Sequence, residues 1–326
     1  MPFKSYVRIF WCAVSTSMLL FCGTTQAQTW PTKPIRLIVP YPPGGGTDIV
    51  ARLLASGLTE KLGQTVIVEN KSGASTIIGT SFVSKAEPDG YTVGVVTDSF
   101  VINPKFMKEL PYDSLKDFAP ISQLVRLPFV LLSTPKLGVN NVGELVAKAK
   151  ARAATINYAS IGNGTPHYLA MEWFKHVAGV DLTHIPYTGV APALNGLVGQ
   201  QVDVMFTGLS TGMPYVNDGR LKALAVASLQ RAKTAPNVPT VAESGYAGFE
   251  FVPWYGLVAP TGTPEKIVDQ LSLAVKEVMA DPAIQARLDT LGVEPTTSSP
   301  EQFGKFLAEM SRQYAEIIDK TGARAE

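Results

Sequence analysis

Apolar positions near the start of the chain switch from the period of a strand to the period of a helix. The run Ile35–Val39 predicts a buried strand. Apolar side chains then recur every three or four residues and predict a helix over 48–62, which Gly63 ends; they are Ile49, Val50, Leu53, Leu54, Leu58 and Leu62. Two more strands are predicted at 66–68 and 91–97, with a short helix at 77–86 between them.

The same alternation continues after residue 128. The helix at 166–177 has a strong start signal, because Thr165 can cap it and Pro166 suits its first position. Pro192 suits the first turn of a helix that follows Gly189. The predicted strands are 129–133, 156–159, 182–185, 202–207 and 221–227, and the other predicted helices are 142–153 and 211–218.

The C-terminal part is predicted to return to the first half of the fold. A strand at 249–253 would cross back, and a second strand at 254–259 would follow it. Thr263 would cap a helix over 265–279 with Pro264 at its first position, and a long amphipathic helix over 300–318 would end the chain.

This order of elements predicts an α/β fold with two lobes, of the kind found in periplasmic binding proteins. Each lobe would be a mixed, mainly parallel sheet flanked by helices. Residues 28–127 and 250–326 would form the first lobe, and residues 128–249 the second. Crossings near 126–129 and 248–253 would act as a hinge, with a cleft between the lobes.

The stretch after the first predicted strand combines prolines with three glycines: Val39-Pro40-Tyr41-Pro42-Pro43-Gly44-Gly45-Gly46-Thr47-Asp48. The glycines carry no Cβ, so a ligand can approach the backbone N–H groups, and Thr47 or Asp48 would cap the helix behind them. Helix N-termini favour anions. Ile49 replaces the third glycine of the dinucleotide motif, and no Gly-Lys-Ser/Thr of a P-loop follows. The stretch therefore indicates a site for a non-nucleotide anion, with a plain strand-to-helix turn as the alternative.

Four other stretches rich in glycine or hydroxyl side chains follow predicted strands: 69–76, 97–99, 160–167 and 186–194. The carboxyl ends of parallel strands meet at one edge of a sheet, where open α/β sheets bind ligands. We therefore expect the first two stretches to lie beside 39–48, and the other two to lie at the matching edge of the second lobe.

The first 27 residues have the features of a signal peptide. Lys4 and Arg8 precede an uncharged run at 9–23, and Thr25-Gln26-Ala27 has the small-x-small form of a peptidase site. We predict export to the periplasm with cleavage after Ala27.

Composition and charge then exclude several classes of protein. The chain has 326 residues, 46% hydrophobic and 17% charged, which suits a well-packed protein of two domains. Cys12 and Cys22 fall in the signal peptide, so the mature chain would have no disulfide or thiolate. Without Lys4 and Arg8, 26 of the 28 basic residues stand against 27 acidic ones, which leaves a net charge of −1 and no basic face for nucleic acid. After residue 27 no apolar run approaches the roughly 18 residues that cross a bilayer, so we expect a protein free in solution.

An enzyme is the main alternative to a binding protein. Ser160 follows a predicted strand, but Tyr158 stands where a nucleophile elbow needs glycine, and no suitable order of Ser, Asp and His follows. His167 is expected to be a neutral imidazole in the first turn of a helix, hydrogen-bonded to the neighbouring loop, rather than a catalytic base or metal ligand. His176 and His184 lack a matching cluster of Cys, Asp or Glu at metal-ligand spacing. We therefore expect no catalytic residue, no metal and no other cofactor.

Some side chains allow more than one interpretation. Asp48 is expected to brace its turn and to touch a ligand only indirectly, since its charge would repel a carboxylate. Five aromatic side chains could either line the cleft or belong to the core: Tyr41, Phe100, Tyr187, Phe206 and Trp254.

Five motifs occur in one order along essentially the whole mature chain. They are the stretch 39–48, Glu69-Asn70-Lys71-Ser72-Gly73-Ala74, Pro111-Tyr112-Asp113 with Lys116-Asp117-Phe118, Gly162-x-Gly164-Thr165 with His167, and Pro186-Tyr187-x-Gly189 with Pro192-Ala193. Together they resemble the Bug receptors, the extracytoplasmic solute receptors of tripartite tricarboxylate transporters. The resemblance implies a periplasmic, monomeric receptor that closes on a small dicarboxylate, tricarboxylate or aromatic carboxylate and passes it to membrane permease subunits. A sensor that reports to a kinase would use the same site.

The resemblance also implies which residues bind the ligand, with carboxylate contacts from backbone amides and ordered water. They are Tyr41, Gly44, Gly45, Gly46, Thr47, Asp48, Ser75 and Thr76 in the first lobe, and Ser160, Asn163, Gly164, Thr165, His167, Tyr187, Gly189, Val190, Ala191, Pro192 and Ala193 in the second. Gly73-Ala74-Ser75-Thr76-Ile77-Ile78-Gly79 departs from the family pattern, which often has Gly-Ala-Gly-Gly-Asn-Ile-Gly here. Specificity for the far end of the ligand is therefore expected to depend on this segment.

Overall fold

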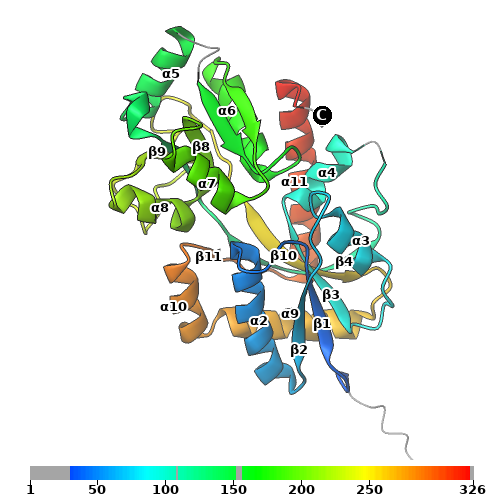
Figure 1. Ribbon diagram of the computed structural model, residues 1–326. Helices are drawn as coiled ribbons and strands as arrows, with labels where there is room; N and C mark the ends of the chain where they lie inside the picture. Colours follow the sequence, from blue (N-terminus) through cyan, green and yellow to red (C-terminus); the bar gives the residue numbers. More distant parts are fainter. Residues whose placement is uncertain (1–29, 108, 152–155, 324–326) are drawn as a thin grey trace, which may run out of the picture. The chain divides into compact units, whose positions relative to one another are not determined.

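A computed structural model of the chain describes residues 30–107, 109–151 and 156–323. The elements below all lie in one compact unit, residues 33–326. The predicted signal peptide and the last two residues of the helix predicted at 142–153 lie outside the described residues. Figure 1 gives the labels of the elements.

The first sheet joins two distant parts of the chain. Its strands β1 (Ile35–Val39), β2 (Val66–Asn70) and β3 (Thr92–Thr97) are parallel, with β1 in the middle. Strand β10 (Trp254–Pro260) lies antiparallel between β3 and β4 (Phe118–Arg126). The short β11 (Glu294–Pro295) pairs antiparallel with β4, which gives the order β11-β4-β10-β3-β1-β2.

The second sheet is built from one continuous part of the chain and has the order β7-β6-β8-β5-β9. Strand β6 (Asn157–Ser160) is parallel to β7 (Thr183–Pro186) and β8 (Val204–Gly208). Strand β5 (Phe129–Ser133) is antiparallel to β8 and to β9 (Lys222–Val226). Below, the first lobe means the first sheet with its helices, and the second lobe means the second sheet with its helices.

Helices connect the strands of both sheets; most lie where the sequence predicts a helix, but α4 and α10 were not predicted. The one at 265–279 has the predicted bounds. The helices are α2 (Gly46–Leu62), α3 (Ile77–Ser84), α4 (Ser99–Phe106), α5 (Val142–Ala151), α6 (Pro166–Ala178), α7 (Val190–Val198), α8 (Leu209–Asn217), α9 (Glu265–Met279), α10 (Pro282–Thr290) and α11 (Pro300–Thr321), with a 3₁₀ turn at Pro135–Leu137.

The mixed α/β architecture with two sheets is as predicted, but parallel pairing does not dominate it. In the first sheet β10 enters between β3 and β4 against their direction. The predicted strand at 249–253 is also wrong. Its residues have no strand partner along their length; Phe251 N donates to Ala227 O (2.8 Å) and Pro253 O accepts from Leu127 N (2.7 Å). Two isolated bonds to different partners replace a ladder, so the buried Phe249 and Phe251 belong to a crossing segment rather than a strand.

Three local predictions at helix starts also need correction. Gly45, not Thr47 or Asp48, is the N-cap of α2, and no side chain caps this helix. Pro264 is the N-cap of α9, while the hydroxyl of Thr263 donates to Pro260 O (2.8 Å). Ile49, which was expected on the buried face of α2, is 37% exposed. The helix begins two residues earlier than predicted, and its buried face is centred on Ala51, Leu54 and Leu58, so that Ile49 lies on the opposite side of the helix.

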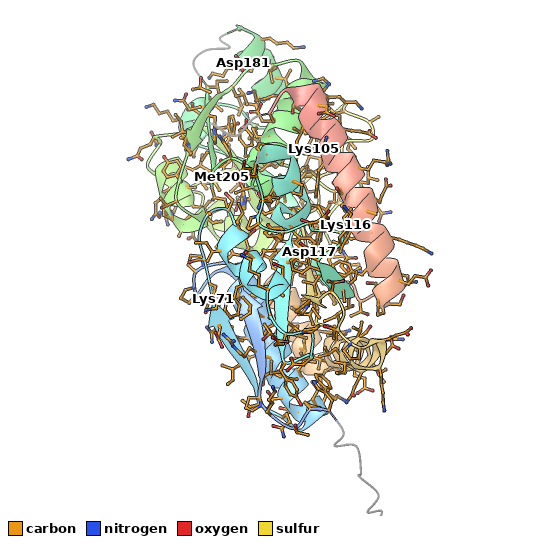
Figure 2. All side chains as sticks on the ribbon, turned by 90° about the vertical axis from the view of Figure 1, so that its right-hand side faces the viewer. Lys71, Lys105, Lys116, Asp117, Asp181 and Met205 are labelled. Carbon is orange, nitrogen blue, oxygen red and sulfur yellow. The ribbon has the colours of Figure 1, made fainter. Side chains whose placement is uncertain are left out.

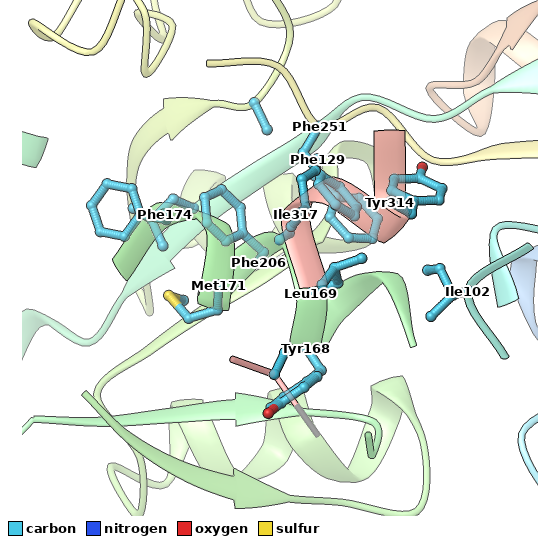
Figure 3. Packing of buried hydrophobic residues seen from close by; sticks show 14 of the residues in the cluster. Ile102, Phe129, Tyr168, Leu169, Met171, Phe174, Phe206, Phe251, Tyr314 and Ile317 are labelled. Carbon is cyan, nitrogen blue, oxygen red and sulfur yellow. The ribbon is translucent and has the colours of Figure 1, made fainter. Parts of the chain in front are cut away.

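Both crossings between the sheets pack against the C-terminal helix. The ring of Phe129, just after the first crossing, lies 6.5 Å from that of Phe251 in the second, and Phe251 lies 5.5 Å from Tyr314 of α11 (centroid distances). Figure 3 shows these three side chains together with Ile317 and Leu169 of α6. Helix α11 also contacts α4 and β4 of the first lobe. The segment that joins the lobes is therefore held in a shared hydrophobic cluster.

Candidate functional site

The glycine turn after β1 is open to solvent. Gly44 has a φ of +83° and Gly45 is extended; a Cβ at Gly44 would meet no atom within 4 Å, and one at Gly45 only Pro42 O at 3.9 Å. Since the first N–H groups of a helix have no internal partner and no side chain caps α2, these donors are available to an acceptor placed on the turn.

Asp48 braces this turn from behind. It is 2% exposed; its Oδ2 accepts from Gly44 N and Arg52 Nε (both 2.9 Å), and its Oδ1 accepts from Asn70 Nδ2 (2.8 Å). Burial raises the pKa of the Asp48 carboxyl, but the hydrogen bonds from Arg52, Gly44 and Asn70 outweigh burial and hold the pKa below its usual value. The Asp48 carboxylate is therefore ionised, and both of its oxygens accept hydrogen bonds from the turn and its neighbours. Asp48 thus braces the turn, as the sequence suggested.

The ends of β2, β3 and β10 complete this edge of the first lobe. Asn70 Nδ2 also donates to Tyr41 O (3.0 Å), and Tyr41 Oη lies 2.9 Å from Thr97 Oγ1. Tyr255 of β10 pairs with Thr97 across the sheet, and its hydroxyl would lie 3.6 Å from a Cβ on Gly46. Burial raises the pKa of both Tyr41 and Tyr255, so they present neutral hydroxyls. The sequence did not indicate Tyr255, because its place depends on the antiparallel insertion of β10.

The second turn of the first lobe has an unusual backbone. Ala74, Ser75 and Thr76 have φ values of +45°, +50° and +78°. Such a conformation costs a non-glycine residue on the order of 1 kcal/mol, so three in a row need outside support. Asn103 Nδ2 donates to Ser75 O (2.7 Å), and Ser75 Oγ donates to Asn163 O of the second lobe (3.5 Å). Thr76 is 5% exposed.

In the second lobe, the turn after β6 is ordered by its own side chains. Ser160 is fully buried; its Oγ lies 2.6 Å from His184 Nε2 and accepts from Gly162 N (3.0 Å). Thr165 caps α6 as predicted: its Oγ1 accepts from Tyr168 N (3.5 Å) and donates to Gly162 O (2.5 Å). Ser160 and Thr165 therefore hold the conformation of this turn through internal hydrogen bonds, and both are too buried to present much surface to a ligand.

His167 follows in the first turn of α6 and is neutral. Its side chain packs 4.8 Å from the ring of Phe129, and burial lowers its pKa to about 3. Its Nδ1 is one of the buried side-chain atoms that have no hydrogen-bond partner among the described residues, and so are Asn163 Oδ1 and Thr207 Oγ1.

The turn before α7 is the counterpart of the glycine turn in the first lobe. Gly189 is the N-cap without a side-chain cap, Val190 is half-buried, and Ala191 and Pro192 are exposed. Tyr187 N donates to Ser160 O (2.9 Å), which joins this turn to the one after β6. Ala193 instead lies in the core and donates its N–H to Gly189 O (3.1 Å).

Among the aromatic candidates, Phe100, Phe206 and Trp254 are at most 1% exposed and belong to the core, whereas Tyr41 and Tyr187 are half-buried. Within the described ranges, no group of three or more His, Cys, Asp or Glu side chains is placed to hold a metal ion. In the same part of the chain, no helix is both long and apolar enough to cross a bilayer.

The geometry thus places a glycine turn before an uncapped helix N-terminus in each lobe, at α2 and at α7, and each turn follows a parallel strand. Residues 50–323 match the model of the tripartite tricarboxylate transporter family receptor, TctC. The chain belongs to this family. It is 35% identical over 301 residues to protein BugT of Bordetella pertussis, covering 92% of each chain.

Solved structures agree with this family membership. The structure of the periplasmic binding protein BugD has 38% sequence identity and a TM-score of 0.83, covering 91% of this chain and all of that one. The structure of Rhodopseudomonas palustris Rpa4515 with adipate has 32% identity and a TM-score of 0.85 over the same shares of the two chains. This TctC-family chain is thus a solute-binding receptor with the two-lobed fold of periplasmic binding proteins.

Proposed function

We propose that this receptor captures a small carboxylate between its lobes and delivers it to a tripartite tricarboxylate-type permease, without converting it. The observation that carries the proposal is the open glycine turn at the start of α2: no side chain caps the first N–H groups of this helix, and the one carboxylate beside them, Asp48, is fully engaged by Gly44, Arg52 and Asn70. The related protein solved with adipate supports a ligand with a carboxylate at each end.

Backbone donors can supply enough binding energy for such a ligand. A hydrogen bond to a charged group contributes roughly 1.5–3 kcal/mol, so two bonds from each lobe give a gross gain of about 6–12 kcal/mol before ordering costs. A micromolar dissociation constant corresponds to about −8 kcal/mol. Because only the closed form makes contacts from both lobes, the ligand would shift the balance between open and closed forms.

The binding residues we propose are those predicted from the sequence together with Tyr255, and their roles are now divided. The N–H groups of Gly45 and Gly46 would meet one carboxylate, Gly44 would leave room for it, and Val190 and Ala191 would meet it or the far group from the second lobe. Ser75, Asn163 and Tyr255 would shape the far end. The remaining predicted residues support these turns from behind.

The division of the lobes at residues 127 and 250, a hinge at the crossings, a monomeric state and cleavage after Ala27 stay predictions. Mass spectrometry and light scattering of the protein secreted by a host that expresses residues 1–326 would test the last two.

Calorimetry on residues 28–326 with a panel of dicarboxylates, tricarboxylates and aromatic carboxylates tests the binding site. Gly45→Val should abolish binding of every acid that binds the natural chain, because the extended backbone accepts valine while the side chain covers the turn. Gly143→Val is the matched control, at an exposed position in the first turn of α5. Unchanged affinity in Gly45→Val would remove this turn from the site. Capture of the permease subunits by the loaded receptor would test delivery.

A further inference from the structure

Helix α4 carries a stripe of side chains that were not among the predicted ligand-binding residues, although Ser99 also interacts with the Tyr41 hydroxyl. Ser99, Asn103 and Phe106 are spaced four and three residues apart, so they lie along one face of the helix. Ser99 and Asn103 are fully buried and Phe106 is 7% exposed. Figure 2 shows α4, marked by Lys105, where the elements of the two lobes meet.

This stripe meets the turn after β6 of the second lobe through polar contacts. Ser99 Oγ donates to Gly164 O (3.2 Å). Asn103 Nδ2 holds Ser75 O (2.7 Å), and Ser75 Oγ in turn donates to Asn163 O (3.5 Å). Two consecutive carbonyl groups of the second lobe thus accept hydrogen bonds from two hydroxyl groups of the first.

The fit at this contact depends on glycine. Gly164 has a φ of +72°, and a Cβ there would lie 3.1 Å from Asn103 Oδ1 and 3.9 Å from Phe106. Phe106 closes the apolar side, with its ring 6.1 Å from that of Tyr168 in an edge-to-face arrangement. The backbone of the second lobe therefore rests directly on the stripe.

We propose that Ser99, Asn103 and Phe106 form a docking seat that holds the closed form of the receptor and populates it even without ligand. The inference rests on the proposed closure of the lobes. The seat contacts join the two lobes, so they exist only when the lobes meet, whereas contacts inside a lobe persist in both forms. Ser99 and Asn103 are positioning residues, which set affinity by stabilising closure rather than by touching the ligand.

Double electron–electron resonance on residues 28–326 tests the seat, with spin labels at Glu60→Cys and Lys150→Cys, two exposed positions in α2 and α5. Ser99→Ala should lower the ratio of closed to open populations about threefold to tenfold, the equivalent of one hydrogen bond. Ser114→Ala is the matched control: its buried Oγ also donates to a carbonyl of α4, Phe100 O (2.5 Å), but within the first lobe. This control should leave the ratio unchanged.

A second pair of variants approaches the seat from the other lobe. Gly164→Ala should open the receptor, because its Cβ would meet Asn103. Gly162→Ala is the control: its φ of +104° places a similar backbone strain on the same turn, but a Cβ there would meet no atom within 4 Å, so this variant should not open the receptor. The same populations are measured without ligand and with 10 mM adipate.

Three results would overturn the proposed seat. The first is the same closed-to-open ratio in Ser99→Ala and the natural chain, and the second is an equal fall of this ratio in each variant and its control. The third is a single distance between the spin labels under all conditions. If adipate does not change the closed-to-open ratio while Ser99→Ala still lowers it in the ligand-free receptor, the proposed seat is supported and adipate is not the ligand.

Discussion

Replacing Asp98 and His167 one at a time should tilt the pH dependence of folding stability in opposite directions. Asp98 is fully buried at the end of β3 and accepts hydrogen bonds from the Tyr314 hydroxyl and from Trp254 N (3.1 Å). Burial outweighs these bonds and raises the pKa of Asp98 to about 7, while burial lowers the pKa of His167 to about 3. The two groups therefore bind protons differently in the folded and unfolded states.

The signs follow from proton linkage. Between about pH 4 and 7, folded Asp98 keeps a proton that the unfolded chain has lost, so its contribution to stability falls as the pH rises. Between about pH 3 and 6.5, unfolded His167 binds a proton that the folded chain excludes, so its contribution rises with pH. One proton corresponds to roughly 1 kcal/mol for each pH unit. The two slopes nearly cancel from pH 4.5 to 6.

Asp98→Asn should therefore gain roughly 1 kcal/mol per pH unit relative to the natural chain over this range, and His167→Gln should lose as much. Urea unfolding of residues 28–326 without ligand, followed by tryptophan fluorescence at pH 4.5, 5.25 and 6, measures both slopes. Asp289→Asn, at an exposed position in α10, is the control. If Asp98→Asn runs parallel to this control, the carboxyl of Asp98 is not protonated in the folded chain and the reasoning fails.

Three further substitutions test other parts of the structure. Thr76→Ala should change the ranking of bound acids in calorimetry more than it changes the melting temperature; an identical ranking would contradict the role given to the 73–76 segment. Asn70→Ala should weaken ligand binding, since it frees Asp48 Oδ1 and Tyr41 O, and unaltered affinity would mean that the turn needs no brace. Gly57→Ala should destabilise the fold by about 1–3 kcal/mol, because its Cβ would overlap Val278 of α9; Gly304→Ala, with only an ordinary contact at 3.5 Å, should be neutral or stabilising in the same urea titration.

The sequence predicted best those elements whose signal is local. Helices α9 and α11 have one apolar face each, and α6 starts with a capping threonine followed by proline. Helix α4 was missed because it is buried almost all round, so it has no amphipathic period, and because Pro104 lies within it. The crossing segment was mistaken for a strand because its alternating buried aromatics imitate one.

The candidate site divides in the same way. The glycine turns could be located from the sequence because their composition is local. Ser99 and Gly164, which meet across the lobes, are 65 residues apart in the chain, and Tyr255 reaches the site only through the antiparallel insertion of β10. No local pattern encodes such pairings, so they had to come from the structure.

The position of β10 in the first sheet also determines the order in which the two sheets can form during synthesis. All strands of the second sheet lie within residues 129–226, whereas β4 joins β3 only through β10, which is made some 130 residues later. A nascent chain can complete the second sheet early, but its first sheet stays in two separate pieces until residues 254–260 emerge. The exposed edges of β3 and β4 in that interval are the surfaces on which a chaperone would act.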